Sequence, residues 1–326
     1  MILNWAIIGS GDVVRRLVKN SFNTRYSKVK YVLSKEINLA KKVCTKYDYG
    51  ISTNKLKRIL DDNQVNCVYI ATPPDSHYKY IKLFAKKKLN ILCEKPIVLK
   101  EKHLNEIYSL IKKHKISFYG CFYRREQRRF KYIKKLLKNN IIGKVLSFDY
   151  KLHHSLKSHP TAPITNKKNI PWRFNKKISG GGNFLDMGLH VLDFLLDIFG
   201  DYKDFQKLDH KSYKIYNVED SFILNLKFKS GVLGQCAWHS NVSETKDLIK
   251  VYGEKGIIEF SFNFNDKITI YKDNKIKKKL IKLSDPAHKP IVTKVIKLFS
   301  NSIKNKKAYV DKKTFNVTKL QNLLAK

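Results

Sequence analysis

Long apolar runs, glycine and proline are all scarce in this sequence of 326 residues. No uninterrupted apolar stretch approaches the roughly 20 residues that a membrane-spanning helix needs. The apolar residues 1–8 are too few for a signal peptide and have no basic lead-in, so they indicate a strand. With 14 Gly and 8 Pro, the sequence fits neither a collagen-like nor a proline-rich chain. We expect no membrane partner.

Paired cysteines are also missing. The five cysteines are odd in number and widely spaced, and none forms a Cys-x-x-Cys pair. This argues against a disulfide framework and a zinc knuckle, and it indicates reduced thiols in a cytoplasmic protein. The spacing of His153, His154 and His159 is typical of no zinc site. We therefore predict a cytoplasmic location and no metal ligands.

Acidic residues are few. There are 27 Asp and Glu against 66 Lys and Arg, which gives a formal net charge of +39. Only nine of the basic residues are arginine, the residue that bidentate recognition of phosphates and bases favours, and the lysines are spread along the whole chain. A compositional bias is therefore favoured over a nucleic-acid role, and we expect no nucleic-acid partner. The positive field still helps anionic ligands to arrive.

Hydrophobic residues, at 43%, can form sizeable cores, and the length suits about two domains. Over the first 120 residues, short apolar strands alternate with helices, which is typical of a doubly wound parallel sheet in an α/β fold. After residue 219, strands at hairpin spacing indicate an α+β domain with a mainly antiparallel sheet. The predicted domains are residues 1–121 and 122–326. Two final helices, about 287–304 and 312–324, are candidates for packing back on the first domain.

A glycine-containing turn joins the first predicted strand to a helix predicted over residues 12–21. Gly9 permits a tight turn, and Gly11 lets the backbone approach a pyrophosphate at the helix N-terminus. Val14 replaces the third glycine of the usual fingerprint, so we expect slightly looser packing of helix on strand. An ordinary tight turn is the alternative. The predicted dinucleotide-binding residues here are Gly9, Ser10, Gly11, Asp12 and Val13.

The end of the second strand bears on the choice of nicotinamide cofactor. A site selective for NAD usually has an acid here that binds the ribose 2′-hydroxyl. This sequence has Ser34, which does not repel a 2′-phosphate, and Lys35, which can pair with one. We predict NAD or NADP as cofactor, with NADP weakly favoured. The alternative, that Lys35 is one more solvated lysine, has equal weight.

Two further segments have chemically useful side chains. Residues 71–77 and 93–96 each follow a predicted parallel strand, and open α/β sheets bind ligands at the carboxyl ends of their strands. Farther along, the glycine triplet 180–182 opens an apolar helix. Asp186 and His190 are four residues apart on that helix and share one face, which suits a general base beside a carboxylate.

These motifs, in this order, resemble those of the glucose–fructose oxidoreductase/inositol 2-dehydrogenase (Gfo/Idh/MocA) family. The likeness extends from Gly9-Ser10-Gly11 through Thr72-Pro73, Glu94-Lys95-Pro96 and Asp186-x-x-x-His190 to the turn at residues 253–256. It implies an N-terminal Rossmann domain, a C-terminal domain with a large open sheet, and a homodimer or homotetramer. It also implies an NAD(P)-dependent dehydrogenase or reductase that acts on a CH–OH group of a sugar, nucleotide sugar or cyclitol.

The resemblance also implies roles for individual residues. Lys95 matches the family's active-site lysine, and Asp186 and His190 match its second-domain pair. His190 suits the base that accepts the hydroxyl proton, with Lys95 hydrogen-bonded to the same oxygen, and which of the two transfers the proton stays open. Asp186 orients His190 or holds a neighbouring hydroxyl. The implied cofactor contacts of this part of the sequence are Ala71, Thr72, Pro73, His77, Glu94 and Lys95.

Two loops add candidate substrate contacts. Tyr123 and Arg124 lie where the family often has a substrate-facing Asn/Arg segment, and Tyr123 departs from that Asn. Trp172 and Arg173 lie in the loop before the glycine triplet, and loops often determine specificity. The predicted substrate-binding residues are Lys95, Tyr123, Arg124, Trp172, Arg173, Asp186 and His190.

Other functions compete with this interpretation. A non-catalytic NAD(P)-binding sensor is less favoured, because Lys95, Asp186 and His190 are all intact. Charge-driven nucleic-acid binding lacks a helix-turn-helix, zinc-finger or aromatic-rich RNA motif. A third hypothesis, within the family, is redox-neutral chemistry, in which a tightly held cofactor is oxidised and re-reduced in one cycle. The basic composition mildly favours an anionic sugar-like substrate.

Overall fold

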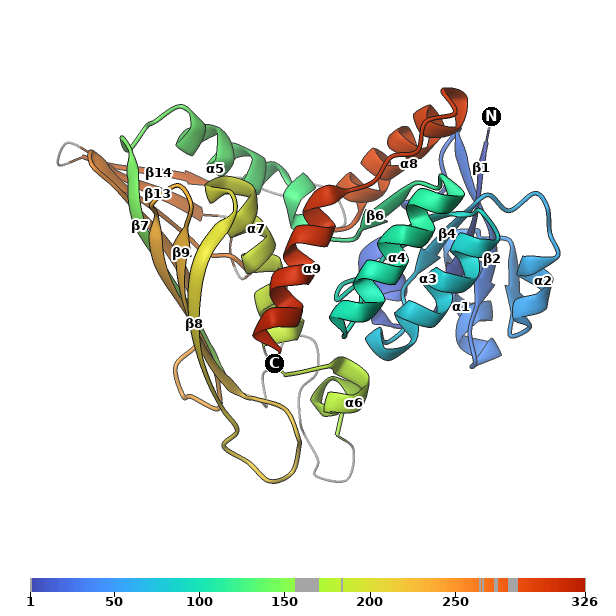
Figure 1. Cartoon of the computed structure of the whole chain (residues 1–326), viewed down its shortest axis with the longest axis horizontal. Helices are drawn as coiled ribbons and strands as arrows, with labels where there is room; N and C mark the ends of the chain where they lie inside the picture. The colour runs from blue at the N-terminus through green and yellow to red at the C-terminus, as the bar shows by residue number, and fades with distance from the viewer. Residues whose placement is uncertain are drawn as a thin grey trace. The chain divides into compact units, whose positions relative to one another are not determined.

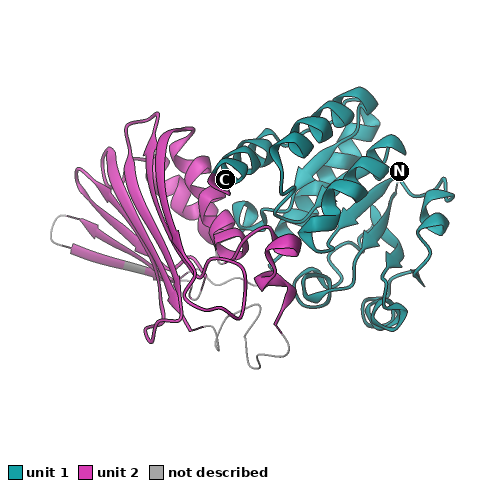
Figure 2. Cartoon of the chain, turned by 60° about the horizontal axis from the view of Figure 1, so that its bottom comes forward, with its two compact units in different colours: residues 1–127, 284–323 teal, residues 128–283, 324–326 magenta. Residues whose placement is uncertain are grey.

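The computed structural model contains two compact units, shown in separate colours in Figure 2. The first consists of residues 1–127 with 284–323, and the second of residues 128–283 with 324–326. The structure describes residues 2–155, 170–182, 184–263, 265, 267–272, 275–280 and 287–325.

The first unit is built on a six-stranded parallel sheet with strand order β3-β2-β1-β4-β5-β6 (Figure 1). This is the doubly wound order, and it reverses direction between β1 and β4, where such sheets bind ligands. The strands are β1 (Leu3–Ile8), β2 (Ser27–Leu33), β3 (Ile51–Thr53), β4 (Cys67–Ile70), β5 (Asn90–Cys93) and β6 (Phe118–Gly120). The helices are η1 (Val13–Val18), α1 (Ile37–Tyr47), α2 (Leu56–Leu60), η2 (Pro74–Ser76), α3 (His77–Lys86), α4 (Glu101–His114), η3 (Tyr123–Glu126), α8 (Lys289–Lys304) and α9 (Lys312–Leu324).

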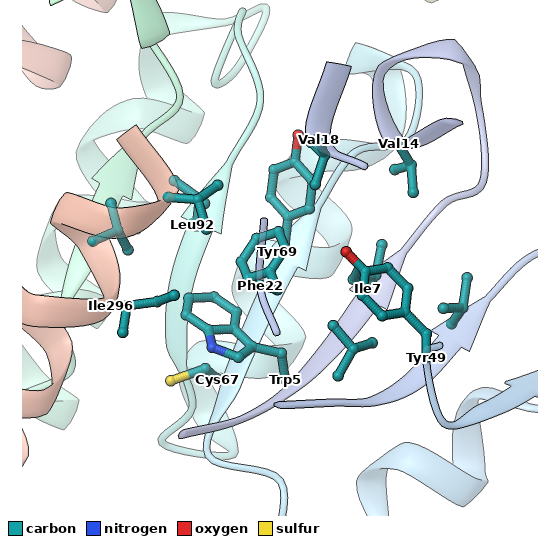
Figure 3. Close-up of a cluster of buried hydrophobic side chains, with 14 of the residues drawn as sticks. Trp5, Ile7, Val14, Val18, Phe22, Tyr49, Cys67, Tyr69, Leu92 and Ile296 are labelled. Atoms are coloured by element: carbon teal, nitrogen blue, oxygen red, sulfur yellow. The ribbon is translucent and has the colours of Figure 1, made fainter. Parts of the chain in front are cut away.

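Each face of this sheet has its own apolar core, because side chains alternate between the faces of a strand. On one face Trp5 and Tyr69 pack with Phe22, with ring centroids 4.8 Å apart for Trp5–Phe22 and 5.3 Å apart for Phe22–Tyr69 (Figure 3). Phe299 of α8 stacks on Trp5 at 5.9 Å. On the other face Ile8 and its neighbours pack against α3 and α4.

The C-terminal helices therefore belong to the first unit by their contacts. Val310 forms a parallel bridge to Phe118 of β6, which extends the sheet beyond its last strand. Arg125 and Asp311 form a buried ion pair at 2.7 Å. The sequence division at 121/122 placed residues 122–127 and 284–323 in the second domain, whereas the contacts place them in the first unit.

The second unit is an eight-stranded mixed sheet with order β14-β13-β12-β11-β7-β10-β9-β8. Its neighbouring strands are antiparallel except for the parallel pair β7 and β10. The predicted fold class, a doubly wound parallel sheet followed by a mainly antiparallel one, is confirmed. The strands are β7 (Val145–His154), β8 (Tyr202–His210), β9 (Ser221–Phe228), β10 (Leu233–Ser240), β11 (Lys246–Gly253), β12 (Gly256–Phe260), β13 (Lys267–Lys272) and β14 (Lys275–Leu280).

Aromatic side chains join this sheet to helices on one of its faces. Phe130 lies 5.2 Å from Phe194 and 4.8 Å from Phe262, and Phe148 stacks on Phe199 at 5.3 Å. The helices of the unit are α5 (Arg128–Lys138), η5 (Trp172–Phe174), α6 (Lys176–Ser179), η6 (Phe184–Gly188) and α7 (Leu189–Phe199). Within the described part of the chain, no helix combines the length and apolar character needed to cross a membrane.

Candidate active-site residues

The glycine turn after β1 is held by its neighbouring strands. Gly9 has φ +112°, and a Cβ there would lie 2.6 Å from the Ala71 carbonyl oxygen, so only glycine fits without strain. A Cβ on Gly11 would meet nothing within 4 Å. The Gly9 N–H donates to Leu33 O at 2.8 Å, and the Ala71 N–H donates to Ile8 O at 2.8 Å. The turn thus lies at the carboxyl ends of β1, β2 and β4.

The helix that follows is shorter than the predicted residues 12–21. It is a wide π-type segment, Val13–Val18, in which the Lys19 N–H bonds to Val14 O, five residues back. Lys19 then adopts φ 48°, which ends the helix. Val14 is fully buried in the core (Figure 3), and the slightly looser packing expected from the missing third glycine stays a prediction. Asp12 pairs with Arg15 at 2.6 Å on the exposed side.

Ser34, at the end of β2, is joined to the glycine turn. The Ser10 hydroxyl donates to Ser34 Oγ at 2.7 Å, and the Glu36 N–H donates to the same atom at 3.2 Å. Lys35 is exposed. The structure therefore places Ser10 and Ser34 side by side, with a serine at the position where a NAD-selective site usually has an acid.

His77 connects the loops that follow β4 and β5. Its Nε2 lies 2.8 Å from Thr72 O, and its Nδ1 lies 2.8 Å from Pro96 O. Burial lowers the pKa of His77, against the opposing effect of the two carbonyls. Because both ring nitrogens face backbone oxygens, His77 links the two loops, and its predicted cofactor contact stays a prediction. Thr72 Oγ1 accepts from the Ser76 hydroxyl at 2.7 Å, and Pro73 is exposed.

Glu94 follows β5 and directs its carboxylate into the interior. Oε1 accepts from Tyr69 Oη at 2.6 Å and from His288 Nε2 at 3.0 Å, and the Cys121 thiol also bonds to the carboxylate. Burial alone would raise the pKa of Glu94, but its hydrogen bond to His288 and the other two donors bring that pKa below its usual value. Glu94 is therefore an ionised, hydrogen-bonded carboxylate. Lys95, partly buried, follows it and precedes a cis peptide bond to Pro96.

Three potential metal-ligand atoms lie within 4.8 Å of one another in this cluster, those of Glu94, Cys121 and His288. The group was not predicted, since the three residues come from separate parts of the chain. The polar side chains found next to Glu94 are Tyr69, Cys121 and His288. No local sequence pattern identified Tyr69 or His288, and Cys121 was noted only as one of five scattered cysteines.

Tyr123 and Arg124 belong to η3 in the first unit. The Tyr123 ring stacks on His288 with centroids 4.5 Å apart and an interplanar angle of 25°. The Arg124 guanidinium lies 5.3 Å from the Tyr123 ring centroid. The structure thus groups these two predicted substrate residues with the Glu94 cluster.

The second unit holds the other predicted residues. Gly182 is required there, since a Cβ would lie 1.9 Å from Glu219 O, and its N–H donates to Glu219 Oε1 at 2.8 Å. Asp186 lies in η6, and its Oδ2 is 3.6 Å from Arg173 Nε. Arg173 lies over the Trp172 ring at 4.5 Å. Trp172, Arg173 and Asp186 are thus brought together.

His190 occupies the first turn of α7 and is 7% exposed. The helix that carries it begins at Leu189, directly after Gly188, where a Cβ would lie 2.7 Å from Phe184 and 3.0 Å from Trp238. Close packing at Gly188 therefore fixes the start of α7. Asp186 lies in the π-type segment η6 and His190 in the first turn of α7, and the shared helix face stays a prediction.

Comparison with known proteins connects these residues to a family. Residues 3–120 match the model of the oxidoreductase family with an NAD-binding Rossmann fold, and residues 130–259 match the model of the GFO/IDH/MocA C-terminal domain. An oxidoreductase of Formosa agariphila is 29% identical over 300 residues, which are 91% of each chain. The myo-inositol 2-dehydrogenase of Thermotoga maritima is 28% identical over 222 residues, 66% of this chain and 62% of that one.

Solved structures share the fold over the whole chain. A levoglucosan dehydrogenase in complex with NADH and levoglucosan superposes with a TM-score of 0.81 at 19% identity, covering 100% of this chain and 98% of the other. The two family models match consecutive parts of the sequence in the order that the motifs predicted. The chain belongs to the Gfo/Idh/MocA family of oxidoreductases, with an NAD-binding Rossmann fold as its first domain.

Proposed function

We propose that this protein transfers a hydride between NAD(P) and a secondary alcohol or ketone of a sugar, nucleotide sugar or cyclitol. One observation carries the proposal. The Gly9 turn, the Thr72-Pro73 loop and Lys95 follow β1, β4 and β5, three adjacent strands at the point where the strand order reverses. Family membership supports it, as does the likeness to a myo-inositol 2-dehydrogenase in sequence and to a levoglucosan dehydrogenase in structure.

The first unit binds and orients the cofactor in this proposal. The open space beside Gly11 admits the pyrophosphate, and the linked hydroxyls of Ser10 and Ser34 face the ribose. The cofactor, when bound, supplies the hydride acceptor or donor, and the protein supplies position and electrostatic field.

The remaining residues handle the proton and the substrate. Lys95 donates a hydrogen bond to the reacting oxygen and stabilises negative charge on it, and His190 accepts the proton when the alcohol is oxidised. Asp186 with Arg173 and Trp172 binds neighbouring hydroxyls or orients His190. Tyr123 and Arg124 contact the substrate from the first unit. The homodimer or homotetramer implied by the resemblance remains part of this proposal.

A thermal-shift screen tests the function. NAD, NADH, NADP and NADPH are added first, and sugars, sugar acids and nucleotide sugars follow in the presence of the best cofactor. A ligand at 100 times its dissociation constant stabilises the folded protein by about 2.7 kcal/mol. A dinucleotide shift followed by a further substrate shift supports a dehydrogenase. A dinucleotide shift without turnover of any stabilising sugar favours the non-catalytic sensor instead.

Cofactor selectivity is a separate prediction. We expect wild-type protein to bind NADPH more tightly than NADH, and Ser34→Asp to reverse this order by at least about tenfold. The added carboxylate repels a 2′-phosphate and accepts a hydrogen bond from a 2′-hydroxyl. Dissociation constants from nicotinamide fluorescence measure the ratio. The Lys35→Met variant measures how much Lys35 contributes to the affinity for NADPH. Equal affinities of the wild type for NADPH and NADH would contradict the prediction.

A further inference from the structure

The Glu94 carboxylate, 7% exposed, accepts hydrogen bonds from distant parts of the first unit. Burial raises the pKa of Tyr69 and of Cys121 well above their usual values, so both remain protonated donors. An ionised carboxylate only accepts hydrogen bonds, so His288 Nε2 carries the hydrogen in the 3.0 Å contact. His288 is separated from Glu94 by 194 residues and is 1% exposed.

His288 contacts both Glu94 and Tyr123. Its Nε2 binds Glu94, which precedes Lys95 directly, and its ring stacks on Tyr123 at 4.5 Å. A second contact from the same C-terminal segment acts nearby, since Gln321 Nε2 of α9 donates to Val98 O at 2.9 Å. The segment that contains Lys95 is therefore held from the far end of the chain at two points.

We propose that His288 is a positioning residue of the cofactor site, which holds Glu94-Lys95-Pro96 and the Tyr123 ring in their working arrangement. The inference rests on the proposed function and deepens it, because it assigns a role to a residue outside the predicted site. His288 acts through Glu94 and Tyr123.

The charge of Glu94 shows why this contact matters. The titratable groups that face it are Tyr69 of β4, Cys93 of β5, Cys121 after β6, His77 of α3 and His288 before α8. Two printed hydrogen bonds, from Tyr69 and from His288, reach the same carboxylate oxygen of Glu94. Without His288, the carboxylate loses the donor at 3.0 Å, and the segment that contains Lys95 loses one of its two attachments to residues 288–321.

Two substitutions separate the functions of the histidine. His288→Phe keeps an aromatic ring against Tyr123 and removes the donor to Glu94. His288→Gln keeps an N–H donor at the same reach and removes the ring. The matched control is His103→Phe, since His103 also stacks on a tyrosine of this unit, Tyr78 at 3.8 Å. Dissociation constants for NADPH and NADH are measured by fluorescence.

We expect His288→Phe to weaken dinucleotide binding about tenfold. His288→Gln should restore most of the affinity, and His103→Phe should behave as wild type. A role confined to packing would leave His288→Gln, which lacks the ring, at least as weak as His288→Phe. If His288→Phe does not fold, Tyr69→Phe removes another donor from Glu94 and should weaken binding in the same way.

Three outcomes overturn the proposal. If the wild type binds the dinucleotide and a folded His288→Phe protein binds it equally well, the inference about His288 is wrong. The proposed function is then unaffected. Failure of the wild type itself to bind rejects both. If purified wild type contains stoichiometric zinc and His288→Phe contains none, we would conclude that Glu94, Cys121 and His288 are metal ligands instead.

Discussion

Replacement of Lys95 by methionine is expected to lower kcat about 1,000-fold while the affinity for NAD(P)H changes less than about threefold. Methionine keeps the length and apolar stem of lysine but cannot donate a hydrogen bond or carry charge. A donor that stabilises charge on the reacting oxygen contributes about 10²–10³-fold to the rate, and proton transfer contributes a comparable factor. Steady-state kinetics with the substrate found by the screen, together with fluorescence titration of the cofactor, provide the measurement.

Lys79→Met is the matched control for this loss, because Lys79 is an exposed lysine of α3 in the same unit. It should retain wild-type kcat and KM. A Lys95→Met enzyme with kcat within tenfold of wild type would show that Lys95 is not the group that binds the reacting oxygen. His190 would then be the candidate for the group that binds the reacting oxygen, and His190→Asn tests this in the same way.

The second large effect is expected at Gly9. Gly9→Ala should lower the free energy of unfolding by at least about 2 kcal/mol and abolish measurable dinucleotide binding. The added Cβ lies 2.6 Å from Ala71 O, and φ of +112° is strained for any L-residue with a side chain. The turn must shift away from β4, which displaces the surface proposed to receive the pyrophosphate. Urea denaturation and cofactor titration measure the two effects.

Gly11→Ala is the partner experiment two residues away. A Cβ there meets nothing within 4 Å, so the stability of the protein should stay within about 0.5 kcal/mol of wild type. Binding should still weaken, because the methyl group occupies the space proposed for the pyrophosphate. Full retention of cofactor affinity in Gly11→Ala would argue that the dinucleotide does not lie against this turn.

The sequence predicted the elements that depend on local pattern. Apolar strands such as residues 3–8 and 67–70 are buried runs between helices, and periodicity identifies them directly. The spacing of Asp186 and His190 likewise predicts a shared helix face. The π-type geometry of Val13–Val18 was not predicted, since it depends on bonds that end at Lys19 and not on apolar periodicity.

Local sequence patterns did not predict the cluster around Glu94, for a different reason. Tyr69 lies in β4 and Cys121 directly follows β6 of the same sheet, but His288 reaches Glu94 only through the return of the chain to the first unit. That return depends on long-range contacts such as Arg125–Asp311 and Phe118–Val310, which no sequence motif predicts. The same contacts explain why the predicted boundary at 121/122 differs from the observed units.

The return of residues 284–323 to the first unit also has a consequence for synthesis on the ribosome. The strands of the first sheet emerge early, yet Trp5 is covered by Phe299 and Ile296 of α8, which are made after the whole second sheet. The nascent nucleotide-binding unit therefore exposes part of one apolar face until α8 has been made. Binding of chaperones to nascent chains should accordingly persist past the second sheet and end only as α8 emerges.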